Sequence, residues 1–427
     1  MRAGFYECDI TPPLGGFMWG HYRFVQAAEV FEKLYAKAVV IENDGSYAAI
    51  VVVDTCVVPR EMHDAVTKRV EQFTGITPDK VCIASNHAHS GAPVSDGPEV
   101  GGYADVNYTD VFYRLTADAI ILAYQRLEEV ELSFDEPLIA GISYCRDHEL
   151  NDGTLITHGG DRIDVIRHLS EPDRVFPILY FKANDRVIGT ISCFACHLDT
   201  IGSTHPVKGY SGDYSSVISM ELKEHYGDDF VNVFLIGCAG DINTANPNAN
   251  AKAYNYIDIG KELAKVIRKR EKYAKTVTSS DVRAVKETIT LERRIIHDQA
   301  EANRKMSAML LEKQNPLRVR NMIYYMAANT EYTTDLYVQG ILIGDVYFSL
   351  LPGEIFTNTG KRIKAESPFG RTVVAENCNS YCGYLPPEEL FTDKCNLYET
   401  SLAFHSCHKP ESATLLADLA IKLSKTI

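Results

Sequence analysis

The sequence lacks any hydrophobic run long enough to span a membrane, since no apolar stretch in its 427 residues approaches the roughly 18 residues that such a helix requires. Residues 1–9 carry no apolar core of the kind found in an export signal. An even set of cysteines is missing as well, and the eleven that are present suit a reducing compartment better than a disulfide framework. We therefore expect a cytoplasmic protein without stable membrane insertion.

Positive charge is also scarce. The sequence has 43 Lys and Arg against 57 Asp and Glu, which gives a formal net charge of −14 and an isoelectric point near 5.4. Nucleic acids and anionic membrane surfaces would be repelled over most of such a surface, so neither is expected as a partner. A small-molecule substrate remains as the expected partner, and the sequence leaves the formation of a homo-oligomer open.

Repeats, low-complexity runs and tracts rich in Pro, Ser or one charge are absent, so no segment has the composition of an interdomain linker. The length would permit either two domains or one large, elaborated domain. Because no linker is found, we predict a single domain spanning residues 1–427.

Short runs of β-branched and aromatic residues alternate with longer segments whose apolar residues recur three and four positions apart. This alternation is typical of an α/β protein, with a β-sheet core flanked by helices. Strands are predicted at 48–54, 81–87, 176–182, 187–197, 231–237, 336–343, 346–351 and 371–376. Helices are predicted at 60–73, 109–126, 215–225, 257–270, 299–313 and 411–422.

Several of the predicted strands end in a side chain that can do chemistry. The residues at these ends are Asp54, His87, His197, Asp241 and Glu354. In α/β sheets, ligands bind beyond the carboxyl ends of the strands. We therefore expect these five side chains to face one crevice, with a metal site at the strand ends.

The strongest signal is the pair His87 and His89, at the point where an apolar run meets the loop Ser90-Gly91. In extended backbone, residues i and i+2 point to the same face, so both imidazoles can approach one ion, or an ion and its substrate. A catalytic zinc site usually takes three protein ligands and leaves one position open for water. Other segments must therefore complete the site.

The remaining candidate site residues each have a simpler structural interpretation. Cys193, Cys196 and His197 match the spacing of a c-type haem attachment site, but they lie in a strand-like run without an export signal, so we interpret the cysteines as buried apolar residues. Glu354 precedes a helix-like stretch at 357–364, where a carboxylate can serve only the helix N-terminus. Asp241 opens an oxygen-rich loop that lacks the Gly and terminal Glu of an EF-hand.

Taken in order, short motifs along nearly the whole chain resemble the catalytic domain of the neutral (non-lysosomal) ceramidases, zinc-dependent amidases that cleave the N-acyl bond of ceramide. These motifs are Asp9-Ile10-Thr11-Pro12-Pro13-Leu14-Gly15, Asn86-His87-Ala88-His89-Ser90-Gly91, His197, Ser211-Gly212-Asp213-Tyr214, Gly240-Asp241, Pro352-Gly353-Glu354, Asn379-Ser380-Tyr381-Cys382-Gly383-Tyr384-Leu385, Tyr398-Glu399 and His405.

The resemblance implies a Zn²⁺ ion and its ligands. The first histidine of the family's His-x-His, a later histidine, the glutamate of Pro-Gly-Glu and a tyrosine correspond to His87, His197, Glu354 and Tyr384. Tyr381 is the alternative for the last ligand, since two tyrosines lie in the matching segment. A mixed set of nitrogen and oxygen donors suits zinc.

The implied reaction is metal-assisted hydrolysis, in which zinc activates a water molecule and polarises the carbonyl group. His89 would then transfer a proton, and Asp54 and Asp213 would orient the ligand imidazoles. Asp241 and Asn243 complete the expected catalytic residues. Asn243 stands where the family has a serine; it cannot act as a nucleophile, although its amide could donate to an oxyanion.

We therefore expect a short member of this family, without the family's C-terminal β-sandwich domain. The expected function is zinc-dependent hydrolysis of an amide bond in a soluble small molecule. Two alternatives remain open. One is the same chemistry on another bond, in a cyclic amide, an ester or a carbohydrate derivative, and the other is a metal-containing binding protein without catalysis.

Overall fold

The computed structural model describes residues 1–20, 25–94, 104–201, 208–248, 254–296 and 331–427, together with residues 304, 322, 323, 325 and 326. The predicted helix at 299–313 lies outside this part of the chain except for Arg304. Among the described residues, none of the helices combines the length and the apolar character that a membrane crossing needs.

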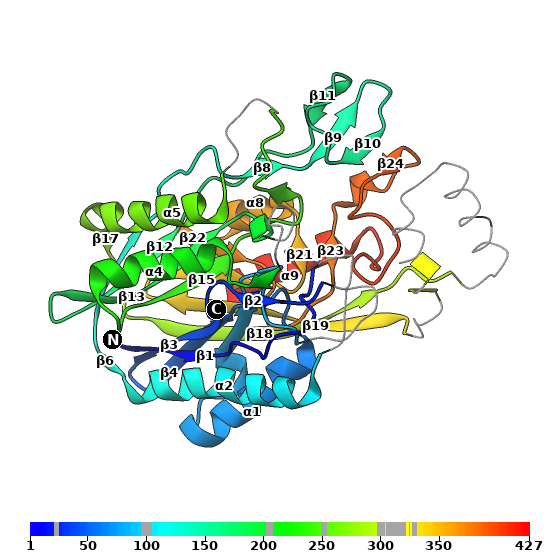
Figure 1. Ribbon diagram of the computed structural model, residues 1–427. Helices are drawn as coiled ribbons and strands as arrows, with labels where there is room; N and C mark the ends of the chain where they lie inside the picture. The colour runs from blue at the N-terminus through cyan, green and yellow to red at the C-terminus, as the bar shows by residue number, and fades with distance from the viewer. Residues whose placement is uncertain are drawn as a thin grey trace.

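Three β-sheets pack their inner faces into one shared hydrophobic core (Figure 1). The first sheet has the order β5-β4-β3-β1-β6, from β1 (Arg2–Asp9), β3 (Tyr35–Asn43), β4 (Ser46–Val53), β5 (Val81–Ser85) and β6 (Glu128–Glu129). The second has the order β15-β13-β12-β7-β17, from β7 (Glu131–Asp135), β12 (Ile178–Ala183), β13 (Arg186–Phe194), β15 (Val231–Ile236) and β17 (Lys275–Thr276). The third has the order β18-β19-β20-β22, from β18 (Val282–Glu292), β19 (Thr333–Ile343), β20 (Val346–Leu350) and β22 (Arg371–Ala375).

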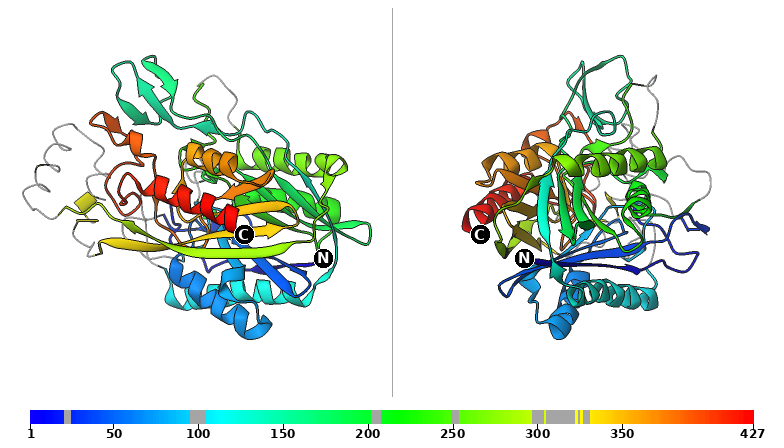
Figure 2. Two further views of the ribbon diagram at one scale, coloured as in Figure 1. Left: turned by 180° about the vertical axis from the view of Figure 1, so that it is seen from behind. Right: turned by 90° about the vertical axis from the view of Figure 1, so that its left-hand side faces the viewer.

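Each sheet is covered by a pair of helices on its outer face, as the two views of Figure 2 also show. The first sheet carries α1 (Arg60–Thr74) and α2 (Val106–Gln125), the second α4 (Tyr214–Tyr226) and α5 (Tyr256–Arg270), and the third α8 (Thr357–Glu366) and α9 (Ser412–Thr426). Strands β4, β5 and β15 are buried on both faces, so they are apolar almost throughout rather than alternating. The local sequence sets the helix ends: Asp105 accepts backbone N–H bonds at the start of α2, and Gly75 ends α1 at a φ of 76°.

Smaller sheets surround the carboxyl ends of the large ones. One has the order β11-β9-β10-β24 and projects at the top of Figure 1; it contains β9 (Asp147–Leu150), β10 (Leu155–Thr157), β11 (Val165–His168) and β24 (Cys395–Asn396). Three strand pairs are β2 (Glu29–Val30) with β14 (Gly209–Tyr210), β8 (Tyr144–Cys145) with β16 (Ile242–Asn243), and β21 (Glu354–Ile355) with β23 (Tyr384–Leu385).

Each large sheet contains one parallel pair of strands, namely β4 with β5, β13 with β15, and β20 with β22. Parallel neighbours send their carboxyl ends to the same edge of a sheet. Isolated bridges then join the sheets beyond these ends, between Ala84 and Cys378 and between Gly237 and Ala375. The three sheets therefore deliver their strand ends to one region of the molecule.

The structure confirms the α/β class and every predicted strand, with ends that shift by at most three residues, as for 187–197 against Arg186–Phe194. The other predicted helices are confirmed as well, the largest shift being the end of 411–422 at Thr426. Of the strands in the three large sheets, the prediction omitted β1, β3, β6, β7, β17 and β18. Cys193 and Cys196 are buried free thiols, as interpreted from the sequence.

The contact between Phe5 and Phe181 joins the first sheet to the second. Both rings are buried, their centroids lie 5.1 Å apart, and they meet edge to face. We expect Phe181→Ala to lower the free energy of unfolding by about 3–5 kcal/mol because it leaves a cavity between the two sheets. Urea denaturation measures this change. Phe73→Ala on α1, where the side chain is 55% exposed, is the matched control and should cost less than about 1 kcal/mol; equal losses would contradict the prediction.

Candidate metal centre

His87 follows β5 in a backbone conformation that few side chains adopt. Its φ is 63°, in the left-handed region, and its side chain is 1% exposed. The side chain of the preceding Asn86 holds this turn: its Nδ2 donates to Asp54 Oδ1 at 2.7 Å, and its Oδ1 accepts from Ala88 N at 3.2 Å. A strained residue persists only where its surroundings fix it, so the turn points the imidazole into the region where the sheets meet.

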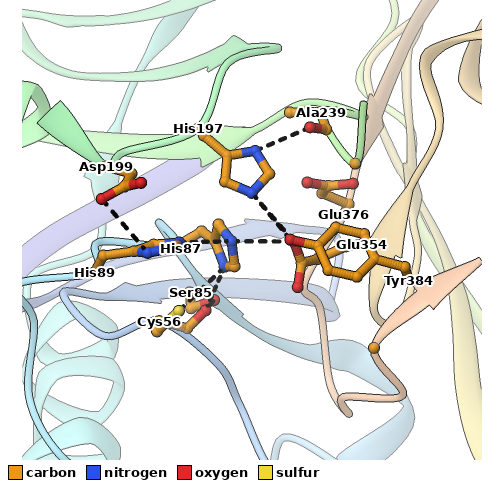
Figure 3. Close-up of polar contacts among 12 residues, drawn as sticks. Cys56, Ser85, His87, His89, His197, Asp199, Ala239, Glu354, Glu376 and Tyr384 are labelled. Atoms are coloured by element: carbon orange, nitrogen blue, oxygen red, sulfur yellow. Dashed lines mark hydrogen bonds and ion pairs between the residues drawn. The ribbon is translucent and has the colours of Figure 1, made fainter. Parts of the chain in front are cut away.

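His87, His197 and Glu354 converge on one point, although they come from three different sheets (Figure 3). Glu354 Oε2 lies 3.3 Å from His87 Nε2 and 3.2 Å from His197 Nε2. All three side chains are buried. Among the described residues, this oxygen has no other hydrogen-bond partner. The three groups therefore present two nitrogen atoms and one oxygen atom to the same small volume.

Backbone carbonyl groups set the orientation of both imidazoles. His87 Nδ1 donates to the carbonyl of Cys56 at 2.8 Å, and His197 Nδ1 faces the carbonyls of Ala239 and Ile242 at 2.9 and 3.0 Å. A proton on Nδ1 leaves the lone pair on Nε2, so both lone pairs point toward Glu354.

The prediction that Asp54 and Asp213 orient the two imidazoles is wrong. Asp54 instead binds Asn86, the backbone of Tyr35 and Lys37, and Asp213 accepts from Tyr214 N at the start of α4. Backbone carbonyl groups already face the Nδ1 atoms of both imidazoles, so the carboxylates have other partners.

Two tyrosines from the same segment reach the centre from different sides. Tyr381 donates to Glu354 Oε1 at 2.8 Å, and the hydroxyl group of Tyr384 lies 3.4 Å from His197 Nε2. Tyr384 sits directly opposite Glu354 in the parallel pair β21–β23. Tyr381 therefore holds the carboxylate, whereas Tyr384 faces His197 Nε2, so Tyr384 is the better candidate of the two for a fourth donor at this centre.

His89 lies beside the three converging groups. Its Nε2 is 3.3 Å from His87 Nε2, and its Nδ1 is 3.6 Å from Asp199 Oδ1. Asp199 was not anticipated from the sequence, although it stands only two residues after His197. The ring of His89 also leaves no space for a side chain at Gly20, where a Cβ would lie 2.7 Å from it. His89 is thus held between Asp199 and the N-terminal loop.

The electrostatics of the centre favour one added positive charge. Burial alone would lower the pKa of His87, but the neighbouring Cys56 sulfur and the Glu354 carboxylate hold it well above its usual value. Burial would likewise raise the pKa of Glu354, yet the two facing imidazoles hold it well below its usual value. His197 is different, since burial and the charge of Arg146 lower its pKa to about 4. The two histidines and the carboxylate therefore attract a single cation, either a proton or a metal ion.

A second buried charge cluster adjoins Tyr384 and was missed in the sequence. The guanidinium of Arg146 lies over the Tyr384 ring at 5.3 Å, pairs with Glu399 Oε1 at 2.7 Å, and donates to the carbonyl of Gly240 at 2.8 Å. The neighbouring Asp147 is fully buried, and neither of its carboxyl oxygens has a hydrogen-bond partner among the described residues. Glu399 belongs to the Tyr398-Glu399 motif identified in the sequence, whereas no local motif marks Arg146 or Asp147.

The two remaining candidates have local contacts. Asp241 is buried; one carboxyl oxygen accepts from Thr357 N at 2.8 Å, and the other accepts from the Ser170 hydroxyl. It thereby ties its loop to the first residue of α8. Asn243 Oδ1 accepts from Thr244 N at 2.6 Å, which leaves its amide hydrogens as donors. Catalytic roles for Asp241 and Asn243 stay predictions.

The chain has the fold of neutral ceramidase. Neutral ceramidase from Pseudomonas aeruginosa matches it with a TM-score of 0.74 at 17% sequence identity, over 99% of this chain and 74% of that chain. A structure of ceramidase complexed with C2 matches with a TM-score of 0.75 at 18% identity, over the same shares of the two chains. No family model and no curated protein matches the sequence. The resemblance in the sequence motifs is therefore confirmed at the level of the fold.

Asp147 should make stability fall as the pH rises. Burial first, and then the charge of Glu399, raises the pKa of Asp147 well above its usual value. The folded protein then keeps this proton at pH values where the unfolded chain has lost it, so stability declines from the unfolded pKa of about 4 up to the folded pKa. The neutral variant Asp147→Asn removes this decline, by about 1.4 kcal/mol for each unit of pKa difference.

Urea denaturation of both proteins between about pH 5 and about pH 8 measures the difference in free energy of unfolding. The free energy of unfolding of Asp147→Asn, relative to that of the wild type, should increase as the pH rises. A constant difference across the range would contradict a protonated Asp147.

Proposed function

We propose that this protein is a zinc-dependent hydrolase that cleaves an amide bond in a small-molecule substrate. The observation that supports it best is the convergence of His87 Nε2 and His197 Nε2 on Glu354 Oε2, at the strand ends of a neutral-ceramidase fold. Open α/β sheets bind ligands in this position.

The donor set fits zinc. Two imidazole nitrogens and one carboxylate oxygen form the ligand set of several catalytic zinc sites, which keep a further position open. Backbone carbonyls fix both imidazoles with Nε2 inward, as ligating histidines require. Tyr384 supplies the fourth protein ligand, a second oxygen, in this proposal, since its hydroxyl group lies 3.4 Å from His197 Nε2.

A bound zinc ion would lower the pKa of a water molecule and polarise the substrate carbonyl. His89 has a separate task, because it lies beside the ligands while Asp199 contacts its other ring nitrogen. It is therefore placed to carry a proton to the leaving amine. The guanidinium of Arg146, held by Glu399 against Tyr384, adds a fixed positive charge next to the reacting region.

The identity of residue 243 affects which mechanism and substrate we propose. It stands where the resemblance places a serine, and its side chain can donate hydrogen bonds but cannot form an acyl-enzyme. Direct attack by water then accounts for the reaction without a protein nucleophile. With a net charge of −14, a small, soluble N-acyl amine is a better substrate than a lipid presented on an anionic membrane.

Metal analysis of variants should distinguish the proposed zinc ligands from the proposed proton carrier. We expect His87→Ala and His197→Ala to lose about one zinc ion per chain relative to the wild type, because each removes one of the donors. His89→Ala should keep this ion and lose turnover by a factor of about 10²–10⁴. Metal content by mass spectrometry and turnover of the same preparations give both results.

His225→Ala, an exposed histidine on the last turn of α4, is the control and should change neither quantity. Loss of zinc in His89→Ala would assign His89 to the ligands. Unchanged zinc content in both His87→Ala and His197→Ala would refute the proposed centre.

A substrate panel tests which bond is cleaved. We expect hydrolysis of N-acyl amines by the zinc-loaded protein, and loss of that activity on chelation with recovery when zinc is added back. The panel also contains lactams, esters and glycosides of similar size. Activity on one of these alone would move the reaction to that bond, and zinc binding without any turnover would favour a binding protein.

A further inference from the structure

A second group of polar side chains, outside the metal centre, joins helix α1 to the third sheet. Its members are His63 and Asp64 on α1 and Lys286 on β18. His63 is 1% exposed and Lys286 is half-buried, whereas Asp64 is exposed.

These three side chains form a chain of hydrogen bonds. Lys286 Nζ lies 3.1 Å from His63 Nε2, and His63 Nδ1 lies 3.0 Å from Asp64 Oδ1. An ammonium group has no acceptor atom, so Lys286 donates and His63 Nε2 accepts. The imidazole proton is therefore on Nδ1, from which it is donated to the carboxylate. An amine beside a base, with a third group that orients the base, is the arrangement by which proteins activate a nucleophile.

Tyr337 on β19 contacts both ends of this chain. Its hydroxyl group donates to Asp64 Oδ1 at 3.1 Å, and the centroid of its ring lies 4.8 Å from Lys286 Nζ. The amine of Lys286 also donates to the carbonyl of Pro78 at 2.6 Å, in the 3₁₀ turn η1 (Pro78–Lys80). The amine is thus held beside the imidazole by contacts to α1, β19 and η1.

Burial prepares the amine for reaction. It lowers the pKa of Lys286 to about 8 and the pKa of His63 to about 4. At pH 8 about half of such an amine is neutral, against about 0.4% of a lysine with the ordinary pKa of about 10.4. His63 is also neutral there and can accept a proton. Besides His63, the titratable and charged groups around the amine are Arg60 and Asp64 on α1, Asp79 on η1, Cys82 on β5 and Tyr337 on β19.

We propose that Lys286 is a covalent modification site, where its amine is acylated by a small acyl phosphate. The Nζ lone pair attacks the carbonyl carbon, the bond from that carbon to the phosphate oxygen breaks, and phosphate leaves with the electron pair of this bond. His63 Nε2 accepts the proton that Nζ loses. The products are an amide on Lys286 and inorganic phosphate, so neither an oxidant nor a reductant is needed. A small acyl phosphate can reach a half-buried amine and carries its own leaving group.

Acylation would change the contact between the third sheet and the segment that leads to His87. An amide nitrogen is uncharged and keeps one hydrogen, so it cannot donate to both Pro78 and His63. The turn η1 directly precedes β5, which ends two residues before His87. The modification would therefore weaken the attachment of β18 to the start of β5.

Acetyl phosphate is the probe that tests this site. The full chain is incubated with it at several pH values, and the acetylation of each lysine is followed by peptide mass spectrometry. Lys286 should be acetylated faster at about pH 8 than Lys68, an exposed lysine on α1. Its rate should level off above about pH 8, whereas the rate at Lys68 should continue to rise, because only Lys286 is then mostly neutral.

Two variants of exposed acidic residues on α1 test the hydrogen-bonded chain. At about pH 9, where the Lys286 amine is largely neutral, Asp64→Asn should lower its acetylation rate by about 10-fold, because the imidazole loses the group that orients it. Glu61→Gln removes the same charge from the first turn of α1 and should leave the rate unchanged. Neither variant should alter the rate at Lys68.

Acetylation of Lys286 that is no faster than that of Lys68 would overturn the modification site. Equal rates at Lys286 in the wild type and Asp64→Asn would overturn the assistance by His63. Neither substitution affects a residue of the metal centre, so these outcomes are independent of the proposed function.

Discussion

The carboxylate of Glu354, held between His87 Nε2 and His197 Nε2, is the interaction on which the rest of the site depends. A buried carboxylate is costly unless opposite charge or donors surround it. Each of the three groups follows a strand of a different sheet: β5 precedes His87, β13 precedes His197, and β20 precedes Glu354. The site can therefore form only when the three sheets share their common core.

The backbone around these strand ends also orients the three converging side chains. Carbonyls of Cys56, Ala239 and Ile242 fix which imidazole nitrogen faces inward, and Asp54 holds the turn that gives His87 its left-handed conformation. Glu376 acts in the same way, since its buried carboxyl group accepts from Ile355 N beside Glu354. Rigid support of this kind is what lets a metal centre keep its ligand geometry.

Much of the fold and the central trio could be predicted from local patterns. Apolar runs that end in His87, His197 and Glu354 marked both the strands and the residues that meet beyond them. Asp54 and Asp213 were misjudged because the sequence does not show whether a carboxylate faces an imidazole or, as here, a helix N-terminus and neighbouring donors. Arg146 and Asp147 were overlooked because no local motif marks them, and the ion pair of Arg146 with Glu399 joins segments about 250 positions apart, as 399 against 146 shows.

The sequence by itself determined the α/β class, the positions of the helices and of the more apolar strands, and the residue types at the strand ends, because hydrophobic periodicity and turn signals are local. Only the tertiary structure decided which of those ends share one point, which tyrosine faces His197 Nε2, and which nitrogen of each imidazole points inward. Those choices depend on how three sheets pack and on backbone carbonyls from distant segments. The contact between His63 and Lys286 has the same origin, since it joins helix α1 to a strand of the third sheet.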